Sequence, residues 1–159
     1  MEPVKLPPPL LSINVIICEV ILAETNHMVS AIRIADVFHV HDVPNIPVER
    51  QRVQISVLLI GKIAVGDTAQ HAIEVRLIRP DGNVTPIGKR FEDSFVPDVE
   101  RLNVPEGLSV PGGFNISFRL AIEPKQLGTH YIAVSFDGTE IARTPFTLLP
   151  RPVQAQTTD

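Results

Sequence analysis

The sequence feature that most constrains the fold is a large apolar residue at every second position over 114–122. Successive side chains of a β-strand point to opposite faces of its sheet, so residues two apart share a face. The large apolar residues of this segment share one parity, and they are Phe114, Ile116, Phe118, Leu120 and Ile122. The segment is therefore predicted to be a strand with one face in a hydrophobic core.

Similar patterns recur along the chain. Pro86 and Gly88 indicate an edge or a bulge in one of these segments, and Pro145 indicates an edge position for the last. A helix is the rival for the first segment, because short apolar runs are ambiguous, but its β-branched residues favour a strand. The first two segments are predicted to pair as a hairpin. The further predicted strands are 13–22, 28–40, 53–59, 73–77, 84–95, 132–136 and 139–149.

Turn signals separate these segments. Pro80-Asp81-Gly82-Asn83 and Asp137-Gly138 are typical of hairpin turns, because proline pre-sets φ and glycine adopts positive φ without strain. Strands follow one another without intervening helices, which predicts an all-β fold. The expected architecture is an antiparallel two-sheet sandwich, immunoglobulin-like or a related Greek key, with about eight strands. A closed barrel is the main alternative.

One domain accounts for the 159 residues. Residues 1–10, which contain Pro7-Pro8-Pro9, are predicted to form a proline-rich N-terminal arm, and residues 11–150 the β-sandwich domain. Residues 151–159 hold few apolar side chains and are predicted to be a disordered C-terminal tail. The long proline-containing segment 96–113 is either a crossover between the sheets or a binding loop.

A short motif before the strand at 132–136 resembles the tyrosine corner of immunoglobulin-like and fibronectin-like sandwiches: Leu127-Gly128-Thr129-His130-Tyr131. The resemblance implies that the Tyr131 hydroxyl turns back to a nearby backbone group at a crossover between sheets. It is a marker of fold and assigns no functional residue.

A longer pattern resembles a group of small bacterial β-sandwich proteins known only as a domain of unknown function. It comprises an apolar strand from Ile13, a short turn, a second strand that ends at Val40 near an aromatic residue, a proline loop, and a hairpin with Arg79-Pro80-Asp81-Gly82. That group has no assigned activity. The resemblance therefore implies the sandwich fold and transfers no functional residue.

Charge and composition exclude several partners. The net charge is −4 at pH 7 and there is no run of Lys or Arg, so no nucleic-acid partner is expected. The apolar stretch 10–23 is interrupted by Glu19 and is too short to span a bilayer, so no membrane partner is expected either. Cys18 is the sole cysteine, which excludes an internal disulfide, and the cytoplasm is the expected location.

The most suggestive cluster of chemistry-bearing residues contains His39, His41 and Asp42. On a strand, His39 and His41 share a face, and Asp42 follows at the strand end. Two imidazoles and a carboxylate could begin a Zn²⁺ or Fe²⁺ site. The alternative is a polar strand end beside a loop. Only tertiary contacts could add the other histidines, which are His27, His71 and His130.

Carboxylates elsewhere are expected to be solvated charges. Asp36 differs, because it shares the parity of Ile34 and Phe38. It is predicted to be a partly buried acid with a hydrogen-bond partner.

No catalytic or cofactor-binding motif is present, so the leading hypothesis is a non-enzymatic protein-interaction or structural module without a cofactor. Its protein partner is expected at an edge strand or at the 96–113 loop, because an open edge can add a strand through main-chain hydrogen bonds. Two alternatives remain open: a small-ligand or metal-binding sandwich that uses His39, His41 and Asp42, and an unrecognised enzyme. The sequence does not determine the oligomeric state.

Overall fold

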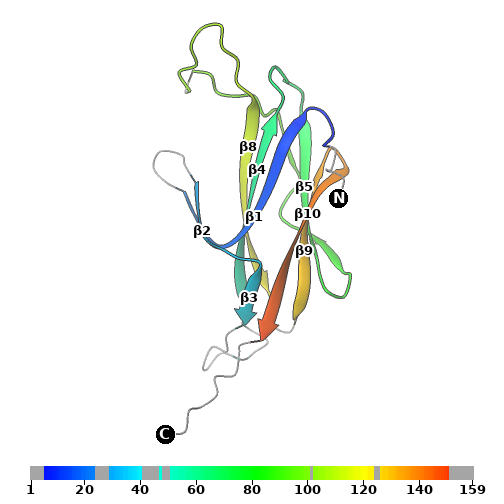
Figure 1. Cartoon of the computed structure of the whole chain (residues 1–159). Coiled ribbons are helices and arrows are strands. Elements are labelled where there is room, and N and C mark those ends of the chain that lie inside the picture. The colour runs from blue at the N-terminus through cyan, green and yellow to red at the C-terminus, as the bar shows by residue number, and fades with distance from the viewer. Residues whose placement is uncertain are drawn as a thin grey trace.

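Two β-sheets lie face to face in the computed structural model, which describes residues 6–23, 29–40, 47, 51–100, 102–123 and 126–150 (Figure 1). These residues form ten strands, which confirms the all-β prediction. The described ranges contain no helix that is long and apolar enough to cross a membrane.

The first sheet has four antiparallel strands in the order β2-β1-β4-β8. Among the described strands, β8 pairs with β4 alone, and this ladder continues over all 11 residues of β8 without a register shift. β8 therefore forms one border of the sheet. The bounds are β1 Leu10–Ala23, β2 Val29–Ile34, β4 Val53–Ile63 and β8 Gly112–Ile122.

The second sheet has six strands. Its main order is β3-β10-β9-β5-β6, and β7 pairs with β5 beside β6. All neighbours are antiparallel except β3, which runs parallel to β10. The bounds are β3 Val37–Val40, β5 His71–Ile78, β6 Val84–Pro86, β7 Phe91–Asp93, β9 Gly128–Phe136 and β10 Thr139–Pro150.

The core lies between the sheets and is built from alternate residues of both. Phe114, Leu120 and Ile122 of β8 are buried, and Ile116 and Phe118 are partly buried against the same core. The polar residues between them are exposed. The predicted strand and its predicted inner face at 114–122 are therefore confirmed.

The predicted single strand at 28–40 is wrong. The chain pairs with β1 up to Ile34 and then crosses to the second sheet, where β3 joins β10. Two backbone bonds fix the crossing: Ala35 N–H donates to Ile17 O (3.1 Å), and Thr147 N–H donates to Asp36 O (2.7 Å). The Asp36 side chain is exposed, so its predicted partial burial is also wrong. The prediction for Asp36 assumed that Ile34, Asp36 and Phe38 lie on one face of a single strand. The chain changes sheets between Ile34 and Phe38, so these residues do not share a face.

The predicted strand at 84–95 is two short strands, β6 and β7, which both pair with β5. Gly88 lies between them with φ of 67°, and the two ladders with β5 differ in register at this sheet border, so the edge or bulge indicated by Pro86 and Gly88 is confirmed. Together with the division of 28–40, this difference explains why the described residues form ten strands where about eight were predicted.

The long segment after β7 connects the second sheet to β8 in the first, so it is the predicted crossover. Backbone bonds organise it locally; one example is the donation from Leu102 N–H to Asp98 O at 3.0 Å. The segment projects beyond the sheets (Figure 1). It exposes Val96, Val99, Leu102 and Leu108.

A hairpin arm leaves the first sheet. It consists of residues 18–23 of β1 and all of β2, because β1 pairs with β4 up to Cys18 and with β2 from Cys18 onward. The Ser56 hydroxyl donates to Glu19 O (3.1 Å) where the arm passes β4. Ile21 then lies beside residues 117–119 of β8. In Figure 1 the arm extends past β8 on the left of the picture.

Candidate functional site: an open strand edge

The predicted metal cluster is only partly described. His39 is exposed on β3, and its Nδ1 lies 3.3 Å from Pro150 O. His41 and Asp42 lie outside the described residues. Among the residues whose structure is described, no group of three His, Cys, Asp or Glu side chains is arranged to hold a metal ion. The metal site at His39, His41 and Asp42 stays a prediction.

The backbone of β8 has one free side. Successive residues of a strand direct their N–H and C=O groups to opposite sides. Gly113 N–H donates to Phe95 O (3.1 Å), which lies outside β4, so odd-numbered residues of β8 point away from β4. In the described structure the main-chain N–H and C=O groups of the next four odd-numbered residues have no hydrogen-bond partner. These residues are Asn115, Ser117, Arg119 and Ala121.

This edge carries few of the features that normally protect a sheet border. Such borders are usually short, or carry bulges, prolines or several charges. β8 is regular over its whole length and has no proline, and Arg119 is its one charged residue. No ion pair or hydrogen bond of Arg119 with another described residue is found. The edge is therefore able to pair with another strand.

Apolar side chains flank the open edge on both faces of the sheet. On the inner face, Phe118 packs edge-to-face against Phe91 of β7, with ring centroids 5.7 Å apart. On the outer face, Ile21 of the hairpin arm lines a hollow of about 400 Å³ with Ser117 and Arg119. A strand added beside β8 would contact both surfaces.

Among the described strands the other borders are shorter or interrupted, and the free side of β1 is a short border over residues 12–17, where β1 pairs with β4 alone. β6 and β7 are three residues each and are separated by a bulge. The border of β10 contains Pro145, which lacks an N–H, and its ladder with β9 shifts register between Glu140 and Ala142. β2 is interrupted by Arg33, whose φ of 54° is left-handed. β8 is the longest regular open edge among the described strands.

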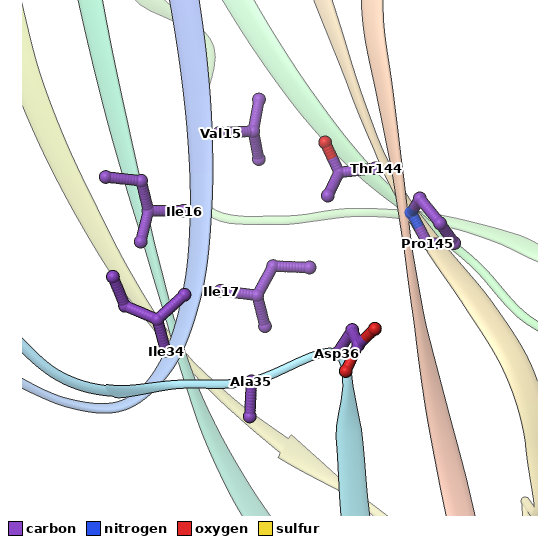
Figure 2. Close-up of a pocket in the computed structure, with 8 residues that line it drawn as sticks. All are labelled: Val15, Ile16, Ile17, Ile34, Ala35, Asp36, Thr144 and Pro145. Atoms are coloured by element: carbon purple, nitrogen blue, oxygen red, sulfur yellow. The ribbon is translucent and has the colours of Figure 1, made fainter.

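On the opposite side of the sandwich, a hollow of about 330 Å³ separates β1 from β10. Figure 2 shows Val15 and Ile17 directed from β1 toward Thr144 and Pro145, with Ala35 and Asp36 at one end. Most of its lining is aliphatic, and Asp36 and Thr144 supply polar side chains. The hollow marks the place where the chain crosses between sheets.

A buried histidine is held between two carboxylates at the start of β5. His71 is 7% exposed and stacks on Phe136, with ring centroids 4.8 Å apart. Its Nδ1–H donates to Asp137 Oδ2 (2.8 Å), and its Nε2–H donates to Asp67 Oδ1 (3.1 Å). Asp137 Oδ1 also accepts Ala72 N–H (2.8 Å). We call His71, Asp67 and Asp137 the His71 clamp.

The electrostatics of the His71 clamp favour a charged imidazolium. Burial alone would lower the pKa of His71, but the hydrogen bonds to Asp137 and Asp67 raise it above its ordinary value. The bond from His71 lowers the pKa of Asp67. Burial opposes the shift at Asp137, but hydrogen bonds from Ala72 and His71 lower its pKa. Both ring nitrogens are occupied, so this histidine is not free to act as a general base.

His130, and not Tyr131, faces the core at the expected tyrosine corner. His130 is fully buried, stacks on Phe146, and its Nδ1–H donates to Gly128 O (3.1 Å). Burial lowers the pKa of His130, which keeps the ring neutral. Tyr131 points to the outer face, and no hydrogen bond of its hydroxyl is found among the described residues.

Sequence reasoning missed both the open edge of β8 and the His71 clamp. Prolines signalled borders at 84–95 and 139–149, but an unprotected border has no such residue to signal it. The clamp joins residues 67, 71 and 137, which only the folded chain brings together. Asp137 was predicted as a turn residue, and that turn between β9 and β10 is confirmed.

No protein-family model matches this chain, and no curated protein matches it. Among solved structures, one similar chain is the Pseudomonas fluorescens alkylpurine DNA glycosylase AlkC, bound to DNA containing an abasic site analog. The identity is 12% and the TM-score 0.42, and the similarity covers 84% of this chain but 30% of that chain. A likeness this distant transfers no residue role. The resemblance to the uncharacterised bacterial group stays a prediction.

Proposed function

We propose that this protein is a non-enzymatic protein-interaction module that accepts an extended segment of a partner protein along β8. The observation that supports the proposal is the open edge, where the main chain of four alternate residues lacks hydrogen-bond partners among the described residues. A segment paired there gains main-chain hydrogen bonds, and its side chains alternate between the two flanking surfaces.

The flanking surfaces define the kind of segment. Its inward side chains meet Phe91 and Phe118, so alternate apolar residues suit them. Its outward side chains lie beside Ser117 and Arg119, where neutral polar residues fit and a directly opposed cation is repelled. The segment therefore needs apolar and polar residues in alternation, as in a half-buried strand.

The finer fold assignment also belongs to this proposal. Immunoglobulin-like sandwiches place their B and E strands in one sheet and their C, F and G strands in the other. Here β4 and β8 share the first sheet, and β5, β9 and β10 are neighbours in the second. This distribution in chain order supports an immunoglobulin-like Greek key.

Proline at position 117 tests the proposal. The Ser117 N–H points to the open side, so Ser117→Pro removes an edge donor and adds a bulky ring without breaking the ladder with β4. We expect affinity purification from the native cell to recover a protein partner with the wild type and to lose it by about tenfold or more with Ser117→Pro.

The matched control is Ser117→Ala, which removes the hydroxyl but keeps the backbone donor. It should retain the partner at the wild-type level. Melting curves of both variants check that the sandwich remains folded. Equal recovery of the same proteins by the wild type, Ser117→Ala and a folded Ser117→Pro would contradict a role for the edge.

A further inference from the structure

We infer that the segment that pairs with β8 is β8 of a second copy of this chain, which forms a twofold-symmetric dimer. The inference rests on the proposed function of the edge and names its occupant. An antiparallel strand paired with its own copy is compatible with a twofold axis, and twofold dimers are the commonest oligomers.

The side-chain pattern of β8 matches the kind of segment that the open edge of β8 would bind. Its inner residues Ile116, Phe118 and Leu120 are apolar, and its outer residues are Asn115, Ser117, Arg119 and Ala121. An incoming copy thus presents apolar side chains to the Phe91–Phe118 surface and mostly neutral side chains to the outer surface. No other described strand has both a regular ladder and this alternation at an open border.

The register follows from the backbone. Odd-numbered residues carry the free N–H and C=O groups, so they must form the hydrogen-bonded pairs. A twofold axis at Phe118 pairs Ser117 with the second copy's Arg119 and uses the whole open stretch 114–122. An axis at Arg119 would instead oppose two guanidinium groups. The axis at Phe118 places those groups diagonally, where they are farther apart.

Aromatic packing supports the same axis. Directly opposed residues of a non-hydrogen-bonded pair approach more closely than those of a hydrogen-bonded pair. Two Phe118 rings would therefore meet at the axis, each already against its own Phe91. Phe91 is 38% exposed in the single chain, and the second copy would cover it.

The hairpin arm lies at the same place. Ile21 is beside residues 117–119, so the axis falls next to the arm. Val20 and Leu22 on either side are 39% and 48% exposed. Their side chains lie on the opposite face of the arm from Ile21, so a dimer through β8 would bring Ile21 next to the second copy.

Sedimentation of the purified full chain over a wide concentration range tests the inference. The wild type should sediment at twice the chain's 17.5 kDa. Ser117→Pro should remain a monomer at concentrations at which the wild type is a dimer, with a dissociation constant raised by about tenfold or more.

Cysteine cross-linking tests the register without relying on proline. Hydrogen-bonded pairs have Cα atoms about 5.5 Å apart, within the disulfide range. A mixture of Ser117→Cys and Arg119→Cys chains, oxidised with copper phenanthroline, should give a mixed disulfide dimer. Ser117→Cys alone should give little, because its copies are diagonal neighbours at about 7–8 Å. Native Cys18 is fully buried and does not compete.

The outcomes separate the two proposals. A wild-type monomer at all concentrations, with partner capture that still depends on position 117, overturns the second-copy inference and leaves strand addition standing. A dimer that persists in folded Ser117→Pro and gives no mixed disulfide also overturns it. If partner capture is unaffected as well, the proposed function is overturned with it.

Discussion

Two borders lie on the same side of the sandwich and differ in almost every respect. The border of the second sheet, made of β6 and β7, is divided by a bulge at Gly88 and carries an ion pair between Arg90 and Glu74 (3.1 Å). The border of the first sheet, made of β8, is regular and carries one charge. One border is closed to further strands and the other is open.

The difference shows that this chain can protect an edge and does so where strands are short. The β6–β7 border is also held to the rest of the second sheet. The His71 clamp lies beside Asp93 of β7, and its hydrogen bond to Asp137 connects β5 with the turn between β9 and β10. In the described structure the open side of β8 has no comparable cluster of side-chain hydrogen bonds. Open edges risk aggregation, and the strand addition proposed above would cover this one.

Hydrogen exchange should show the largest effect, and it addresses the open border directly. In the monomer, the amides of Ser117 and Arg119 face the open side and should exchange with little protection. Those of Ile116 and Phe118 face β4 and should require opening close to global unfolding, typically about 5–15 kcal/mol. Amide-resolved NMR measures both sets. Equal protection along β8 in a monomer would show that the edge is not open.

The two borders should also differ in their contribution to the core. Phe114 of β8 is 8% exposed and packs on Phe95, whereas Phe91 of β7 is much more exposed. Phe114→Ala should lower the free energy of unfolding by about 3–5 kcal/mol, and Phe91→Ala by about 1 kcal/mol. Urea denaturation measures both. A larger loss at Phe91 would reverse the assignment of β8 to the core and β7 to the rim.

The stability that the His71 clamp contributes beside the β6–β7 border should depend on pH. The folded pKa of His71 is raised, so the clamp's contribution is complete below about pH 6.5 and is lost as the pH rises through the folded pKa. The lowered pKa values of Asp67 and Asp137 mean that it is also lost in strong acid. His71→Gln should lower the free energy of unfolding by about 2 kcal/mol near pH 6, and by less at pH 9.

Thermal denaturation at several pH values measures the effect of His71→Gln. The matched control is His39→Gln, since His39 is exposed and lies outside the clamp. Its difference from the wild type should stay small at every pH. A His71→Gln difference that grows from pH 6 to pH 9 would contradict a charged clamp.

The smallest effect is expected at the bulge that closes the β6–β7 border. Gly88 has φ of 67°, and an added Cβ would lie 3.4 Å from the Phe118 ring. Gly88→Ala should cost about 1–2 kcal/mol through left-handed backbone strain. Lys89→Ala next to it should change the stability by less than about 0.5 kcal/mol. Calorimetry of the pair distinguishes backbone strain from a general surface effect.

The sequence predicted much of the fold because strand alternation is local. The parity of 114–122, the turn at Asp137-Gly138 and the interruption at Gly88 are all confirmed. The predicted strand at 28–40 failed because nothing in its own residues shows that the chain changes sheets after Ile34. That change depends on partners far along the chain, such as Thr147.

From the sequence the candidate site could be predicted only as a kind of site, and its use by a partner stays a prediction. An edge strand or the 96–113 loop was expected to bind a partner, but prolines directed attention to 84–95 and 139–149. Those prolines mark protected borders. A border is open when no strand pairs with one of its sides. Which strands pair is decided in the folded sheet and cannot be read from the residues of the border strand.

By itself, the sequence determined which side chains of each strand turn inward, since the stereochemistry of an extended chain fixes that within a few residues. Only the tertiary structure decided which strands are neighbours, where β3 joins β10 in parallel, how His71 meets two distant carboxylates, and which border stays open. The physical reason is that pairing is selected by the free energy of the assembled core and of the closed connections, and both depend on residues far apart in the chain.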